Sequence, residues 1–84
     1  MQLPDETTQS AIRRLKRAQG QIGGIVRMLE EGRDCEEIMV QVSAVAKAVD
    51  RAGFSIIAGG MRECLDSNDA SATDRLEKLF LSLA

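Results

Sequence analysis

The chain has 84 residues, of which 44% are hydrophobic and only 2% aromatic, and its formal net charge is −2. A domain this short buries only ~60% of the surface of its unfolded chain. So many aliphatic side chains therefore favour helices that pack partly against another copy of the chain, and they argue against a β-sandwich, a barrel or a disordered tail. No run of ~20 uncharged apolar residues is present, and no basic-then-apolar signal opens the sequence, so we expect a cytoplasmic protein that makes no membrane contact.

A single all-α domain is expected over residues 1–84. Residues 1–10 are polar and are expected to form an arm that leads into the first helix. From about residue 6 to residue 31, apolar residues recur every three or four positions, which is the pattern of an amphipathic helix. Gly32 follows directly and is expected to be the C-cap residue.

Two further helices are expected after this glycine. The second covers about residues 34–65, with Asp34 as its N-cap, and its apolar surface is broad enough to indicate a central helix that is buried on more than one side. The third is short and covers about residues 71–83. Ser71 and Asp74 resemble a capping box at its start.

Positive and negative charge are unevenly distributed along the chain. Residues 1–33 contain six basic and four acidic residues, whereas residues 34–84 contain five basic and nine acidic residues. Between residues 10 and 27 there are five basic residues and no acidic one. Clustered guanidinium groups bind DNA phosphates and release counterions, so this segment is a candidate DNA-binding surface. A solvated helix face is the alternative interpretation.

The chain contains no histidine and two cysteines, Cys35 and Cys64. Without imidazole, histidine-based zinc sites and Ser–His or Cys–His catalysis are excluded, and we do not expect an enzyme. Two cysteines are also too few for the disulfide scaffold of a small secreted protein. They are either inert core thiols or a functional pair.

The spacing of the cysteines favours a pair that forms between two chains. They lie 29 residues apart on the expected second helix, so a straight helix would separate them by roughly 44 Å and offset them by only about 20° around its axis. An antiparallel dimer of this helix, with its two-fold axis near residues 49–50, would set Cys35 of one chain against Cys64 of the other. Thiolates bind soft metals such as Cu(I) and attack sulfane sulfur. Met61 could add a thioether, or it could simply fill the core.

A longer pattern runs from Arg13 to Cys35 and reads RRLKRAQGQIGGIVRMLEEGRDC. Together with QVSAV at 41–45 and the Arg-Glu-Cys that ends at Cys64, it resembles the CsoR/RcnR/FrmR family of copper-, nickel/cobalt- and formaldehyde-sensing repressors. The resemblance covers about residues 10–66. It implies a three-helix subunit, an antiparallel dimer through the second helix, and a dimer of dimers, that is, a tetramer. It also implies that operator DNA is bound without a helix-turn-helix and that the inducer site lies between subunits.

Within that family, the missing histidines indicate the branch. The copper branch places a histidine four residues before the second cysteine, where this chain has Gly60, and the nickel/cobalt and formaldehyde branches also use histidines. The remaining two-cysteine set is most like the persulfide-sensing (CstR-like) branch. This likeness implies Cys35 and Cys64 from different subunits as sensing thiols, sulfane sulfur donors as inducers, and no cofactor. A Cu(I) site of Cys35, Cys64 and Met61 is the alternative.

We expect Cys35 to be the attacking thiol. It begins a helix, where the macrodipole favours a thiolate, whereas the nearby acids Asp34, Glu36 and Glu37 oppose this effect. Cys64 of the other subunit is expected to resolve the persulfide that forms on Cys35.

The same resemblance assigns operator contacts to basic and amide side chains of the first two helices. Arg14 and Arg51 match positions that the family uses for operator binding, and Lys47 lies one turn before Arg51. Arginine and glutamine can also read base edges. The whole expected set is Arg13, Arg14, Lys16, Arg17, Gln19, Gln21, Lys47 and Arg51. A sulfur-carrier protein that does not bind DNA, and a purely structural helical oligomer, are the competing functions.

Overall fold

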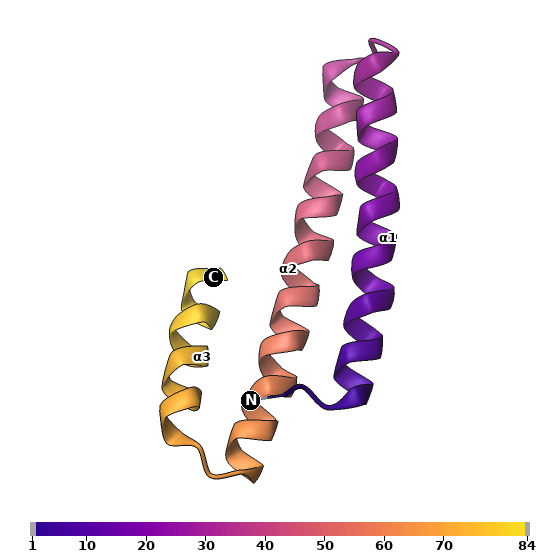
Figure 1. Ribbon diagram of the computed structural model, residues 1–84. Coiled ribbons are helices and arrows are strands. Elements are labelled where there is room, and N and C mark those ends of the chain that lie inside the picture. Colours follow the sequence, from indigo (N-terminus) through magenta and orange to yellow (C-terminus); the bar gives the residue numbers. More distant parts are fainter. Residues whose placement is uncertain (1, 84) are drawn as a thin grey trace.

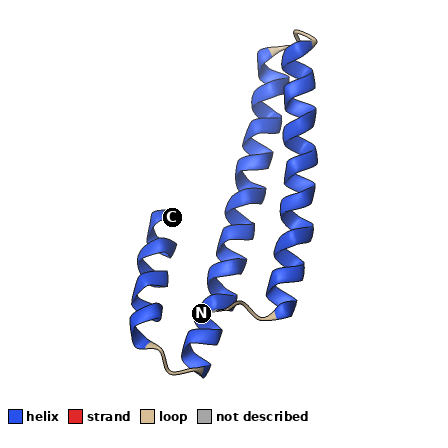
Figure 2. Cartoon of the chain, in the orientation of Figure 1, coloured by secondary structure: helices blue, strands red, loops and turns tan. Residues whose placement is uncertain are grey.

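The structure, a computed structural model, describes residues 2–83. The first and last residues, which bound the expected domain, lie outside the described residues. Three helices, α1 (Asp5–Glu30), α2 (Cys35–Asp66) and α3 (Ala70–Leu83), are joined by short turns (Figure 2). Since residues 2–83 contain no strand, the expected all-α class with three helices is confirmed.

Helix α2 is the central element of the chain. α1 and α2 form a long antiparallel hairpin, and α3 folds back along the carboxyl-terminal half of α2, on the side away from α1 (Figure 1). α1 and α3 each pack against α2 but not against each other. The resulting body is flat and elongated, with extents of 52 × 24 × 13 Å.

Helix α1 begins at Asp5, one residue before the start expected from the sequence pattern. Residues 5–10 of the expected polar arm are helical, and the Pro4 carbonyl accepts a hydrogen bond from the Thr8 N–H at 3.0 Å. Two acidic residues in the first turn complement the positive end of the helix dipole. Thr7 is buried against α2. Packing and dipole together therefore outweigh the polar composition of this segment.

The turn between α1 and α2 is fixed by glycine and aspartate. Gly32 adopts φ +69°, and the Arg33 N–H donates to the Met28 carbonyl at 2.9 Å, which is the bonding pattern of a Schellman C-cap. The Asp34 carboxylate then accepts a hydrogen bond from the Glu36 N–H at 3.0 Å. Asp34 is thus the N-cap of α2, as expected. The C-cap residue of α1 is Glu31, and Gly32, the expected C-cap, follows it and ends the helix with its left-handed conformation.

The turn between α2 and α3 uses Asn68 in place of glycine. Asn68 adopts φ 56°, a left-handed conformation that asparagine tolerates better than most residues. The α3 helix is capped by Asp69, whose Oδ1 accepts a hydrogen bond from the Ala72 N–H at 3.1 Å. The expected capping box at Ser71 is wrong. Ser71 lies inside α3, where its hydroxyl accepts a hydrogen bond from Arg75 Nη1 at 2.8 Å.

Helix α2 runs without interruption over 32 residues although it contains Gly53, Gly59 and Gly60. At Gly59, Thr7 of α1 occupies the space that a side chain would need, because a Cβ built there would lie 2.9 Å from the Thr7 Cβ. At Gly53, a Cβ would lie 3.0 Å from a methyl carbon of Leu83 on α3. These two glycines therefore allow α1 and α3 to approach α2 closely.

Gly59→Ala should lower the free energy of unfolding by about 1–3 kcal/mol, because overpacking against Thr7 outweighs the gain of up to ~1 kcal/mol in helix propensity. The control is Gly20→Ala, where a Cβ would meet no atom within 4 Å. That variant should be as stable as the parent or more stable. Urea unfolding followed by circular dichroism measures both. Equal stabilisation by the two alanines would contradict the close contact at Gly59.

Candidate functional site

One face of the α1–α2 hairpin is apolar and exposed. Leu15, Ile22 and Leu29 follow one another at intervals of seven residues on α1, as do Val42 and Val49 on α2, and their side chains are between 37% and 60% exposed. Since seven residues make almost two full turns of a helix, each set forms one row along its helix. Rows of this kind are the packing seams of coiled coils and four-helix bundles.

The dimensions of the chain agree with this exposed face. Its radius of gyration is 16.2 Å, compared with about 12 Å for a compact domain of the same length. Its accessible surface is 6215 Å², compared with about 4,900 Å² for a folded monomer of the same mass. Both differences are expected of a chain that packs its apolar face against another chain.

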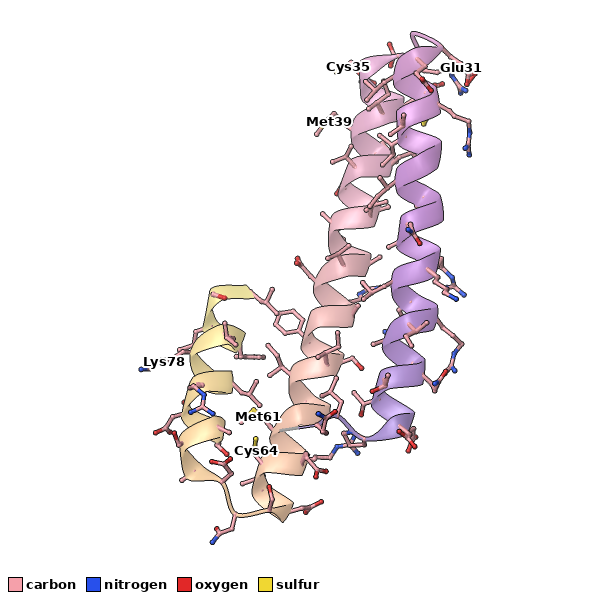
Figure 3. All side chains as sticks on the ribbon, in the orientation of Figure 1. Glu31, Cys35, Met39, Met61, Cys64 and Lys78 are labelled. Carbon is pink, nitrogen blue, oxygen red and sulfur yellow. The ribbon has the colours of Figure 1, made fainter. Side chains whose placement is uncertain are left out.

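The two cysteines lie at opposite ends of α2 (Figure 3). Cys35 is the first residue of the helix and is exposed, whereas Cys64 is only 1% exposed. An uninterrupted helix separates them by roughly 44 Å, so one chain does not bring the two thiols together. Cys35 also lies seven residues before Val42, and thus begins the apolar row of α2.

The start of α2 holds Cys35 on the outside of the molecule. Asp34 caps the helix, and the Arg33 guanidinium group forms an ion pair with Glu37 at 3.0 Å. The nearest basic residue in the sequence is therefore engaged by a carboxylate and does not face the thiol alone. Met39, one turn after Cys35, is also exposed.

Cys64 and Met61 lie one turn apart on the side of α2 that faces α3 (Figure 3). Cys64 and the α2–α3 turn line a small hollow, and Met61 lines another with Phe80 of α3. Within residues 2–83, no three histidine, cysteine, aspartate or glutamate side chains gather in an arrangement that could hold a metal ion. A site that used Cys35, Cys64 and Met61 would thus require two chains.

The expected DNA-contacting residues fall into separate groups. Arg13, Arg14 and Arg17 line a groove on α1 together with Ser10. Lys47 and Arg51 line a second groove, on α2. Lys16, Gln19 and Gln21 line neither groove. Gln19 follows Arg17 by two residues and so points about 160° away from it around the helix.

Helical geometry places both basic groups on the side opposite the apolar rows. Arg13 and Arg17 each lie two residues from Leu15, about 160° around α1. Likewise, Lys47 and Arg51 each lie two residues from Val49, about 160° around α2. The hairpin therefore has an apolar face and, opposite to it, a cationic face.

The two basic groups also lie at the same height along the hairpin. Thr7 of α1 lies against Gly59 of α2, and the helices are antiparallel, so each step forward on α1 corresponds to a step back on α2. Eight steps from this contact bring Leu15 level with Arg51. The arginines of the α1 groove therefore lie level with the part of α2 that holds Lys47 and Arg51.

None of the three helices in the described part of the chain is long and apolar enough to span a lipid bilayer.

Comparison with known proteins identifies the family. Residues 7–82 match the family described as "metal-sensitive transcriptional repressor". The chain is 36% identical over 72 residues to the copper-sensing transcriptional repressor CsoR of Mycobacterium ulcerans, which covers 80% of this chain and 62% of that protein. It is 35% identical over 72 residues to CsoR of Mycobacterium tuberculosis H37Rv, with 80% and 60% covered. With CsoR of Bacillus subtilis 168 it shares 38% identity over 52 residues, with 62% and 52% covered.

The chain thus spans about three fifths of the length of the mycobacterial relatives. Its match to the family pattern extends through all three helices. The chain therefore belongs to the family of metal-sensitive transcriptional repressors.

Proposed function

We propose that the protein binds operator DNA through its cationic face and is released when sulfane sulfur links Cys35 to the partner's Cys64. One observation carries this proposal: both cysteines lie on a single uninterrupted helix, at its opposite ends and almost in line. The apolar row between them is exposed. The arrangement is therefore suited to a thiol pair that forms only between two chains.

Antiparallel pairing of α2 with the α2 helix of a second copy would complete the pair. A two-fold axis near residues 49–50 sets Cys35 beside the partner's Cys64, and the reverse pair forms at the other end. The same pairing buries the row that includes Val42 and Val49. The rows of α1 then cover the flanks, which gives the packing of a four-helix bundle. A dimer of such dimers is the tetramer that we propose for the DNA-bound protein.

The proposed reaction starts at Cys35, because its thiol is exposed. The Cys35 thiolate attacks the outer sulfur of a persulfide, the sulfur–sulfur bond of the donor breaks, and the donor leaves as a thiolate. Cys35 now carries a persulfide. The thiolate of the partner's Cys64 then attacks the inner sulfur of this group, and hydrosulfide leaves. One persulfide has thus oxidised two protein thiols to a disulfide, and one thiol and one hydrogen sulfide are released.

The burial of Cys64 couples this reaction to the shape of the subunit. Because Cys64 is 1% exposed, we expect the α3 end of the chain to move before this thiol reacts, and α3 packs on α2 alone. Its contacts include the Phe54–Phe80 ring pair, with centroids 5.3 Å apart, and Leu83 against Gly53. A cross-link at Cys64 therefore favours a subunit conformation with altered α3 packing. If that conformation binds DNA less well, the cross-link shifts the population away from DNA.

Arg14→Ala and Arg51→Ala test the DNA-binding part of the proposal. Each should weaken binding to a duplex selected from a random-sequence library, and each should reduce the slope of log K against log salt by about 0.9 for every phosphate that the variant no longer binds. Fluorescence anisotropy at several salt concentrations measures this. Arg75→Ala on α3 is the control and should bind like the parent with unchanged helicity. If both variants bind DNA as the parent does, the cationic face is a solvated surface and not a DNA-binding one.

Cu(I) sensing is the second candidate function, because relatives of this chain are named copper-sensing repressors. The sulfur atoms of Cys35 with the partner's Cys64 and the partner's Met61 are soft donors of the kind that Cu(I) prefers. Met61 lies on the Cys64 side of α2, which supports its inclusion. The donor set contains no imidazole, so it differs from a Cys-His-Cys site at the position of Gly60.

One experiment separates the two candidates. Intact mass and DNA binding are measured side by side after treatment with cysteine tetrasulfide, Cu(I) or hydrogen peroxide. We expect the tetrasulfide to release DNA and to produce a covalent dimer that dithiothreitol reverses. Release by Cu(I) without covalent change, and no release by tetrasulfide, would replace the persulfide function with the copper function. A protein that catalyses sulfur transfer but binds no DNA would instead be a sulfur carrier.

A further inference from the structure

The groove on α1 has a composition that suits an anion. It has a volume of about 420 Å³, and it is lined by Ser10, Arg13, Arg14 and Arg17. These residues lie within two turns of the helix, and no acidic residue is among them. Like charges spaced three or four residues apart destabilise a helix. The groove therefore holds positive charge that an incoming anion would neutralise.

In the described part of the chain, the polar groups of this groove have no partners. Within residues 2–83, none of the three guanidinium groups forms an ion pair, and the Ser10 hydroxyl takes part in no hydrogen bond. The spacing of Ser10 and Arg14 does not explain why they form no hydrogen bond with each other, as a second serine–arginine pair shows. Ser71 and Arg75 on α3 are also four residues apart, and there the arginine donates to the serine hydroxyl at 2.8 Å. Ser10 and Arg14 do not form this bond, so both remain available to a ligand.

We propose that this groove receives one phosphate group of the DNA backbone, with the Ser10 hydroxyl donating a hydrogen bond beside the three guanidinium groups. This inference rests on the proposed function and names the contact that Ser10 makes in it. Arginine binds phosphate oxygens through two parallel N–H groups, and serine hydroxyls are common phosphate donors. Because the groove lies opposite the apolar rows, assembly through the apolar face leaves it open to DNA.

Ser10→Glu is the decisive variant, because it should move DNA affinity and stability in opposite directions. The new carboxylate lies three and four residues before Arg13 and Arg14, the order that favours ion pairs in a helix. The thermal midpoint should therefore equal or exceed that of the parent. The carboxylate also takes the place of the phosphate, so DNA affinity should fall at least about tenfold. The matched control is Ser71→Glu, which adds the same charge four residues before Arg75 on α3 and should bind DNA within about twofold of the parent.

Ser10→Ala tests the hydroxyl group alone, because it removes the hydroxyl without adding a charge. It should weaken DNA binding about fivefold, the effect of removing one hydrogen bond, and leave the salt dependence unchanged. A folded Ser10→Glu variant that binds DNA as the parent does would overturn the phosphate groove and leave the proposed function standing. A Ser10→Ala variant with parent-like affinity would overturn the role of the hydroxyl. A parent protein that binds no duplex at any salt concentration would overturn the proposed function itself.

Discussion

Val49→Glu should abolish assembly of the protein into dimers and larger oligomers. Val49 lies in the apolar row of α2, next to the proposed two-fold axis, so each dimer would bring two new carboxylates close together. Asp50, the next residue in each chain, already places a carboxylate near this axis. Analytical ultracentrifugation should show the variant as a monomer at micromolar concentrations at which the parent is a dimer or tetramer.

The expected loss of dimer stability in Val49→Glu follows from burial and charge together. Each valine that loses its apolar partner forfeits about 1–2 kcal/mol, and an unpaired carboxylate in an apolar interface adds several more. The two-fold axis makes each loss occur twice in a dimer. The total loss of association free energy is therefore large enough to dissociate an interface between two short chains. The variant should also lose helicity, since the isolated chain leaves so much apolar surface exposed.

Val40→Glu is the matched control for this prediction. Val40 lies on the same helix and is 64% exposed, compared with 42% for Val49. It lines the groove with Lys47 and Arg51, away from the apolar row. The same change in charge at this position should leave the sedimentation of the protein unchanged. A folded parent monomer at micromolar concentration, or parent-like assembly of Val49→Glu, would remove the proposed interface and the intersubunit thiol pair.

Local patterns were sufficient to predict the helical class. Apolar periodicity identifies each helix, and residues with special turn conformations separate them. Gly32 requires a positive φ and Asp34 offers a capping carboxylate, so the first turn was visible in the sequence. The second turn was less clear, because Asp69 and Ser71 are both good caps. The structure uses Asp69, because the left-handed conformation of Asn68 places Asp69 directly before α3.

Long-range packing was not available from local patterns. Thr7 packs against Gly59, a contact between residues that are distant in sequence, and residues 5–10 belong to α1 partly for this reason. The burial of Cys64 depends on how α3 folds back, which no pattern within α3 specifies. Spacing predicts that the two cysteines lie in line on one helix, but it does not predict that one is exposed and the other buried.

The cationic face was likewise predictable from the sequence only in part. A run of basic residues without acids indicates a surface for an anionic partner. The placement of the Arg14 groove on α1 level with Arg51 on α2 depends on the register of the hairpin. Ser10 gives no signal in the sequence, because an isolated serine in a polar segment is common. Only its position in the groove among the arginines distinguishes it.

Cys35→Ala and Cys64→Ala should both remove the switch, but at different steps. Cys35→Ala lacks the exposed thiol that attacks the donor, so cysteine tetrasulfide should neither modify it nor release it from DNA. Cys64→Ala keeps that thiol. It should gain a persulfide at Cys35, form no covalent dimer and remain bound to DNA. The parent should form the covalent dimer and lose at least about tenfold in DNA affinity, a difference of ~1.4 kcal/mol between the two states.

Three measurements on each protein distinguish these outcomes: intact mass, a gel without reductant, and DNA binding before and after dithiothreitol. Because Cys64 is buried, its alanine variant should also unfold more easily, so binding is measured well below its thermal midpoint. An equal mixture of the two single variants gives the final control. Mixed dimers hold one intact Cys35–Cys64 pair, so a covalent dimer should reappear if the pair forms between chains. Its absence from a mixture shown to exchange subunits would mean that the thiols do not meet across the dimer.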